Sequence, residues 1–226
     1  MNKISKIVGV VCISSMSMIG SANADASAFT GAYVAVTGSA IGMALDGERT
    51  KTLGQAQTTK GKAGMVSPAA GLEAGFSYPL SDMAFITVGA NYQPFDTEVN
   101  ANNVTKTTNV KLTSADIVSV FIEPSFNITE NSAFFIKVAA SESELAATGT
   151  DVTNATYAFD GTTVALGTKT ISDNGMFFKT EAGITDYDSI TINNILEDEA
   201  GSKTFTSTVK ADVEVAYGQV TVGYKF

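Results

Sequence analysis

The sequence predicts an all-β fold, an eight-stranded antiparallel up-and-down transmembrane β-barrel. Three observations predict it. The chain opens with an export signal, apolar and polar residues alternate with a period of two through the rest, and the connections between the alternating segments are by turns short and long. We divide the chain into a cleaved signal peptide, residues 1–24, and an outer-membrane barrel domain, residues 25–226.

The N-terminus carries the pattern of a secretory signal peptide. Lys3 and Lys6 precede the apolar run Ile7–Ile13, and small residues follow that run. Ala22 and Ala24 fit the small-side-chain positions of a signal-peptidase site, so we expect cleavage after Ala24. The alternative is a retained anchor, but the apolar run is about half the ~20 residues that a membrane-spanning helix needs.

The expected mature chain is acidic and lacks both His and Cys. The full chain has 14 basic and 23 acidic residues, and cleavage removes two lysines together with Cys12, which leaves 12 against 23 and a net charge of −11. Such a charge disfavours nucleic acid as a partner. Without imidazole or thiol, the hydrolases and metal centres that depend on them are excluded, so we expect no enzyme, no bound metal and no cofactor.

Two acidic stretches are the remaining candidates for cation binding or for carboxylate catalysis. They are Glu197-Asp198-Glu199 and the pair Asp186 and Asp188. The first could bind Ca²⁺ or bridge it to lipopolysaccharide phosphates. We interpret both as solvated loop, because runs of charge usually lie on the surface.

The lengths of the connections alternate along the chain. Short polar turns are expected at Pro79–Asp82, Thr129–Ser132 and Asp186–Asp188, and long ones at about 46–65, 95–112, 143–173 and 197–207. An outer-membrane barrel has short periplasmic turns and long external loops, whereas a soluble sandwich has no reason to sort its loops in this way.

Each predicted strand has one face that is more apolar than the other, and we assign that face to lipid. The pattern is weak in the first strand, where we favour Ala32, Val34 and Val36 over Tyr33, Ala35 and Thr37, and in the seventh. The remaining apolar faces are Leu72, Ala74, Phe76 and Tyr78; Ile86, Val88, Ala90 and Tyr92; Val118, Val120, Ile122, Pro124 and Phe126; Phe134, Ile136 and Val138; and Met176, Phe178, Ala182 and Ile184.

Charged residues lie on the opposite faces, which we assign to the barrel interior. An eight-stranded barrel is just wide enough inside for side chains, so we expect these charges to form ion pairs that plug the lumen. The alternative is that they line an ion path. Glu123 and Lys137 are expected to face each other across a short turn. The lumen charges are Glu73, Glu123, Lys137, Lys179, Glu181 and Lys225.

Aromatic residues cluster near the ends of the predicted strands, as in the interfacial girdles of membrane barrels. The alternative is the packed core of a soluble sandwich. Tyr78, Phe126, Phe134, Tyr224 and Phe226 lie beside the short turns, and Tyr92 and Phe95 lie toward the long loops.

The last strand alternates strictly and ends on an aromatic residue. Val220, Val222, Tyr224 and Phe226 share its apolar face. This ending resembles the C-terminal insertion signal of bacterial outer-membrane proteins. Together with Phe29–Val34, it makes the mature chain similar to the OmpA/OmpX-type, opacity-protein-like eight-stranded barrels. The resemblance implies recognition of the last strand by the barrel-assembly machinery. The peptidoglycan-binding domain of full-length OmpA has no counterpart in the sequence.

We therefore expect a monomeric outer-membrane protein with a structural or surface-interaction role, such as loop display, adhesion or envelope integrity. Its expected partners are outer-membrane lipid, lipopolysaccharide and a ligand on a host or neighbouring cell. Two alternatives remain: a narrow, porin-like channel for ions or small solutes, and a secreted soluble β-domain that acts as a binding module.

Overall fold

The computed structural model describes residues 26–53, 55–94, 97–98, 110–149, 155–199 and 203–226. The expected signal peptide with Ala22 and Ala24 lies outside these residues, as does Phe95. Within the described part of the chain, no helix is long and apolar enough to cross a membrane.

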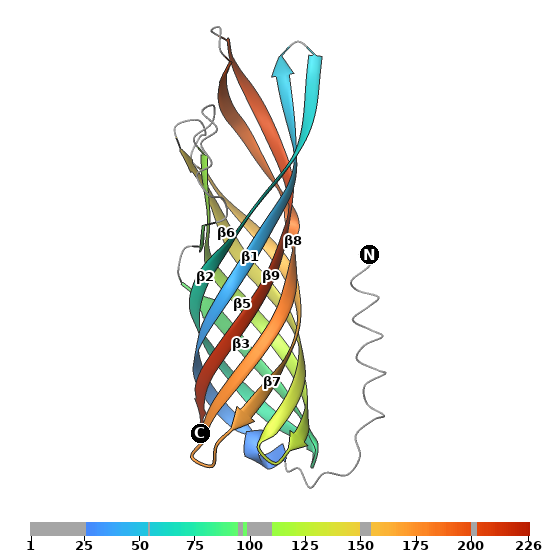
Figure 1. Ribbon diagram of the computed structural model, residues 1–226, viewed down its shortest axis with the longest axis vertical. Coiled ribbons are helices and arrows are strands. Elements are labelled where there is room, and N and C mark those ends of the chain that lie inside the picture. The colour runs from blue at the N-terminus through green and yellow to red at the C-terminus, as the bar shows by residue number, and fades with distance from the viewer. Residues whose placement is uncertain (1–25, 54, 95–96, 99–109, 150–154, 200–202) are drawn as a thin grey trace.

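The strands form one antiparallel sheet that closes on itself (Figure 1). Apart from the short β4, each strand pairs with its neighbours in sequence, and β1 pairs with β9. The pairing of β3 with β5 completes a ring of eight, and the two-residue β4 adds to the edge of β5. The expected eight-stranded barrel is therefore confirmed. The strands are β1 (Gly31–Leu53), β2 (Gln55–Ser81), β3 (Ala84–Gln93), β4 (Thr97–Glu98), β5 (Val110–Thr129), β6 (Ser132–Gly149), β7 (Ala155–Ile171), β8 (Met176–Glu199) and β9 (Lys203–Lys225).

The predicted boundaries were wrong at several places along the chain. The segment expected to be a long connection, residues 143–173, contains the end of β6 and all of β7. The turn expected at Asp186–Asp188 lies inside β8, and the short turn that precedes β8 spans Ser172–Gly175. The segments expected as loops at 46–65 and 197–207 are also largely strand, because the β1–β2 and β8–β9 hairpins continue far beyond the ring.

The lower part of the barrel has an apolar outer surface and a polar interior. Val34 and Val36 point outward, as expected for the first strand, and Tyr33 and Thr37 point inward. Exposed apolar side chains continue around the ring at 41–59 % exposure, a surface suited to lipid acyl chains. This belt includes Val34, Val36, Leu72, Phe76, Val88, Val120, Ile122, Leu166, Phe178, Ile184, Val220 and Val222.

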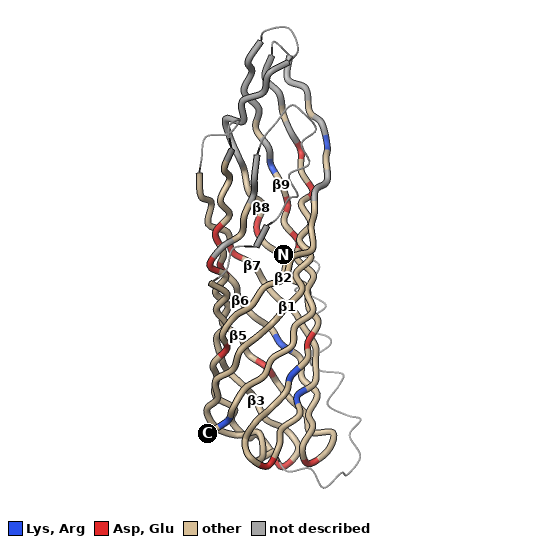
Figure 2. Tube along the Cα trace, turned by 60° about the vertical axis from the view of Figure 1, so that its left-hand side comes forward, with Lys and Arg blue, Asp and Glu red and all other residues tan. Residues whose placement is uncertain are grey.

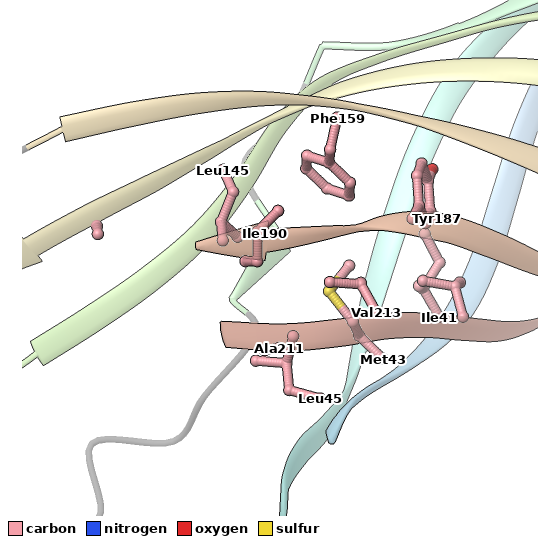
Figure 3. Packing of buried hydrophobic residues seen from close by; sticks show 11 residues of the cluster. Ile41, Met43, Leu45, Leu145, Phe159, Tyr187, Ile190, Ala211 and Val213 are labelled. Carbon is pink, nitrogen blue, oxygen red and sulfur yellow. The ribbon is translucent and has the colours of Figure 1, made fainter. Parts of the chain in front are cut away.

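Higher up, the polarity of the two faces is reversed. The outward positions become acidic, and Figure 2 shows a group of acidic positions midway along the molecule. The inward positions become apolar and form a buried cluster (Figure 3). Charges are costly in hydrocarbon, so this reversal marks the outer edge of the lipid-covered zone. The acidic outward residues are Asp46, Glu48, Glu142, Glu144, Asp160, Asp186, Asp188, Asp212 and Glu214, and the apolar cluster is Ile41, Met43, Leu45, Leu145, Ala147, Phe159, Tyr187, Ile190, Ala211, Val213 and Val215.

Candidate functional site: the filled barrel interior

Five of the six expected lumen charges meet in one buried network. Glu73 comes from β2, Glu123 from β5, Lys137 from β6, and Lys179 and Glu181 from β8, where alternation points both inward. All five side chains are at most 6 % exposed. The network spans the lumen, since it joins strands on opposite sides of the ring.

Lys179 is the centre of this network. Its Nζ donates hydrogen bonds to Glu73 Oε1 at 2.6 Å and to Glu123 Oε2 at 3.2 Å, and Glu181 Oε2 lies at 3.5 Å. Tyr33 donates a hydrogen bond to Glu73 Oε1 at 2.9 Å. Burying an ion is offset only when its partners are close and hydrogen-bonded, and Lys179 has two hydrogen-bonded carboxylates and a third close by.

The expected Glu123–Lys137 pair is present only as a long contact. Lys137 Nζ lies 3.9 Å from Glu123 Oε2, but its main partner is Glu181 Oε2 at 2.5 Å. Tyr217 donates a further hydrogen bond to Glu181 Oε1 at 3.0 Å. The register about the turn brings residues 123 and 137 to the same level, yet the long side chain of Lys137 reaches past β7 to a closer acceptor on β8.

The remaining expected lumen charge, Lys225, lies apart from the network at the turn end of the barrel. Its Nζ donates a hydrogen bond to the carbonyl oxygen of Ala28 at 2.8 Å. Ala28 belongs to a short 3-10 helix, η2 (Ala26–Phe29), that crosses the lower mouth. The backbone N–H of Ala26 donates to Asp82 O at 2.7 Å, which fastens η2 to the β2–β3 turn.

Phe29 closes this lower mouth with an apolar layer. Its ring stacks on Phe85 with centroids 5.0 Å apart, and both side chains are at most 1 % exposed. Ala133 and Ile171 complete the buried layer. The sequence did not single out η2, because a four-residue segment before the first strand has no periodicity to detect.

Lys169 is a buried cation that the sequence analysis missed. It lies on β7, 3 % exposed, with its Nζ 4.7 Å from the ring centroid of Tyr33 and 4.5 Å from that of Phe177. Aromatic faces stabilise a desolvated ammonium. The network of three carboxylates and two lysines carries one excess negative charge, and Lys169 is a third cation in the same interior. Alternation across 155–171 would have been the signal, but Thr occupies both faces and two glycines interrupt the inner one.

Aromatic rings inside the barrel lie over glycines of the neighbouring strand. A Cβ added at these glycines would come within 2.9 Å of the ring atoms, so only glycine leaves room for the ring. Each glycine is the direct cross-strand partner of its aromatic residue. The pairs are Tyr33–Gly75, Phe121–Gly89, Phe135–Gly167, Tyr187–Gly161, Tyr217–Gly183 and Phe177–Gly223.

Hydroxyl groups form a row across four strands above the ion network. Ser119 and Ser141 are 2.8 Å apart, Ser141 and Thr163 are 3.3 Å apart, and Thr163 and Thr185 are 2.7 Å apart, measured between hydroxyl oxygens. The row forms one side of a cavity of about 60 Å³ between the ion network and the apolar cluster.

The other expected sites have mixed outcomes. Val220, Val222, Tyr224 and Phe226 all point outward, at 41–72 % exposure, on β9 and at the C-terminus. The stretch Glu197–Glu199 belongs to β8, and its side chains lie outside the described set. Among the described residues, no three acidic side chains are arranged to hold a metal ion.

No family model and no curated protein matches the sequence, but solved structures match the fold. The outer membrane protein OprG from Pseudomonas aeruginosa matches with a TM-score of 0.52 at 14 % identity, over 87 % of this chain and 96 % of its own. Ail, the attachment invasion locus protein of Yersinia pestis, was solved with the heparin analogue sucrose octasulfate. It matches with a TM-score of 0.45 at 12 % identity, over 84 % of this chain and 99 % of its own. Neisserial surface protein A matches with a TM-score of 0.45 at 15 % identity, over 87 % of this chain and 98 % of its own. With its closed ring, its apolar belt and the match to OprG, the chain has the fold of the eight-stranded outer-membrane β-barrels.

Proposed function

We propose that this protein is an outer-membrane barrel with a structural and surface-interaction role, whose plugged lumen makes it a rigid carrier for the external hairpins. The observation that carries the proposal is the network around Lys179, which joins opposite walls of the ring with five charges buried among one another. Such a network, above the layer formed by Phe29 and Phe85, leaves little path for ions.

The elongated strands support the carrier role. β1 and β2 remain paired as far as Leu53 and Gln55, and β8 and β9 as far as Glu199 and Lys203. At about 3.4 Å per residue, these hairpins rise well beyond the acidic residues that mark the edge of the lipid zone. They would hold the external connections away from the membrane surface, where another cell or a soluble ligand can reach them.

The charge of the outer surface bears on the kind of partner. The acidic rim around Asp212 and Glu214 disfavours polyanions of the sort found with Ail. Lys60 is a cation on this upper surface, but its Nζ lies 2.9 Å from Glu48 Oε1, and that hydrogen bond raises the pKa of Lys60. We therefore propose a neutral or cationic surface partner and expect no binding of sucrose octasulfate.

The experiment is fractionation of expressing cells, combined with migration of the unboiled protein on a gel and digestion of intact cells by added protease. We expect the protein in the outer-membrane fraction, faster migration of the unboiled form, and cleavage in the upper hairpins that leaves the barrel intact. A protein released from cells without detergent would support the soluble binding module instead.

A channel for ions or small solutes is the second candidate, and the cavity beside the hydroxyl row is the observation that favours it. The cavity lies above the ion network, so conduction would require the network to rearrange. Conductance of the purified protein separates the two functions.

A further inference from the structure

The wall of the barrel splits on one side, between β7 and β8. Their pairing ends at Gly161 and Tyr187, although both strands continue upward. A bulge between Tyr187 and Ile190 turns β8 at that level, as bulges do. On the inner side, the rings of Phe159 and Tyr187 cover the split, with centroids 4.6 Å apart (Figure 3).

Two hollows meet at this split, one inside the wall and one outside. The inner one is the 60 Å³ cavity, and the outer one is a groove that runs over the apolar side chains of Val118, Val120 and Ala140. Tyr187 and Ser141 line both hollows, so these two side chains are the partition between them.

The inner cavity has the chemistry of a binding site for an alcohol. Met43 and Val215 form part of an apolar wall. The cavity also has a polar part. Asn91 Nδ2 and Gln93 Oε1 are buried there without a hydrogen-bond partner among the described atoms. Asn91 is only 7 % exposed. An unpaired buried donor and acceptor are costly, and a hydroxyl group can satisfy both because it donates and accepts.

The charge around the groove selects against anions. Glu142, Asp160, Asp186 and Asp188 line it, at the height where the outward surface changes from apolar to acidic. A ligand that arrives here from the membrane surface would lay its chain on Val118 and Val120, and these carboxylates would repel an anionic head group.

Size shows that Tyr187 must move for such a ligand to enter. A cavity of about 60 Å³ has room for roughly four water molecules and is smaller than a cavity that holds benzene. The Tyr187 ring lies directly over Gly161, where an added Cβ would be 2.5 Å from its Cδ1. A side chain larger than hydrogen at residue 161 would therefore displace the ring.

We propose that the inner cavity is a blind binding site for a small neutral amphiphile, whose hydroxyl head pairs with Asn91 and Gln93. The ligand enters sideways through the β7–β8 split, and Tyr187 is the gate. The ion pair between Lys137 and Glu181 closes the floor of the site, so the ligand does not pass to the periplasmic side.

A cysteine reporter tests the gate, since the expected mature chain contains no cysteine. In the Met43→Cys protein, we measure the rate of labelling by methyl methanethiosulfonate. Because Tyr187→Ala removes the ring and Gly161→Ala displaces it, each should speed labelling by about tenfold or more. Gly218→Ala is the matched control, because nothing lies within 4 Å of its added Cβ.

Rates within about twofold of the parent in both gate variants would overturn the gate. An Ala165→Cys reporter, 3 % exposed on the inner face of β7, should stay unlabelled in every variant. Migration of the unboiled proteins on gels checks that each variant is folded.

A competition experiment tests the ligand class in the Met43→Cys, Tyr187→Ala protein. We expect 1-octanol to slow labelling about fivefold or more, octanoate to have no effect, and Asn91→Leu to abolish the protection, each measured against the uninhibited rate of the same variant. Equal protection by alcohol and carboxylate, or protection that survives Asn91→Leu, would show a nonspecific apolar void and overturn the site.

Discussion

At the scale of single residues, the interior is built from pairs of large and minimal side chains. The ring of Phe135 occupies the space left by Gly167 on the adjacent strand, and five other aromatic residues are placed in the same way. A lumen this narrow cannot hold rings from several strands at one level unless their neighbours have no side chain. The packing that results positions the charges, because Phe121 and Phe135 lie within 5.5 Å of the lysine ammonium groups.

Gly167→Ala tests this packing. The added Cβ would meet the backbone oxygen of Thr180 and the ring of Phe135, so we expect a loss of about 1–3 kcal/mol in the free energy of unfolding. Gly218→Ala, which faces open space, should change it by about 0.5 kcal/mol or less. Unfolding in urea of the protein in lipid vesicles measures both, and equal effects would contradict the pairing of rings with glycines.

Lys137→Met tests which charges are true partners. It leaves Glu181 buried without its closest cation, and we expect a loss of about 3–5 kcal/mol in the same unfolding experiment. Adding Glu181→Gln should recover part of that loss. Adding Glu123→Gln instead should recover less, because Glu123 is 3.9 Å from Lys137 and keeps Lys179 at 3.2 Å. The reverse order of recovery would refute the observed network and favour the pair expected from the turn.

At the scale of strands, the alternation of apolar and polar residues predicted the facing of side chains in the lipid-covered part of the barrel. It failed in the hairpins above that part. The faces of Leu72–Tyr78, Val118–Phe126 and the last strand follow the rule of apolar residues outward and polar residues inward, so their lipid and lumen sides were assigned correctly. Above the acidic rim the rule reverses, since water is now outside and the hairpins need an apolar core of their own. For this reason, the acidic outward residues Asp186 and Asp188, which belong to β8, were interpreted as a turn.

β7 was missed for a related reason. Thr and Ala occupy both of its faces, and its inward cation Lys169 lies in a run whose composition otherwise resembles a polar loop. The sequence predicted which residues belong to the charge network, but it did not predict which of them pair with one another. Register gives the level of a side chain in the barrel, whereas lysine and glutamate reach far enough to choose among several partners at that level.

Ile122→Arg tests the position of the lipid zone on β5. Ile122 points outward, 45 % exposed, about midway between the lower turn and the acidic rim. We expect Arg there to cost about 2–4 kcal/mol, as near a bilayer midplane. Glu144→Arg, also outward but within the acidic rim, should change stability by about 0.5 kcal/mol or less. Unfolding from vesicles measures both, and similar costs at the two sites would contradict the membrane boundary.

At the scale of the whole molecule, the barrel is a stack of layers. From bottom to top these are the apolar mouth around Phe29, the ion network around Lys179, the cavity with its hydroxyl row, and the apolar cluster around Val213. The first described segment meets the last strand at the bottom, where the N–H of Phe226 donates to Ala32 O and Lys225 holds η2. Closure of the ring and closure of its mouth thus depend on the same terminal strand.

Deletion of Phe226 tests whether this end directs assembly. Phe226 is 72 % exposed, so its loss removes little side-chain packing and a single backbone hydrogen bond to Ala32 O, and we expect a marked fall in outer-membrane levels because the aromatic terminus is the proposed recognition element. Tyr78→Ala, which removes another exposed aromatic residue near the same turns, is the control and should leave levels near those of the parent. Immunoblots of outer-membrane fractions measure the level of each variant. Undiminished levels after the deletion would remove Phe226 from that role.

Conductance of the purified wild-type protein in planar lipid bilayers tests the plugged lumen most directly. The network around Lys179 and the apolar mouth at Phe29 together predict that the barrel does not conduct. The current across the bilayer should show no reproducible steps at moderate voltage. Stable channel openings of uniform size from the pure protein would contradict the plug and make conduction of ions or small solutes its function.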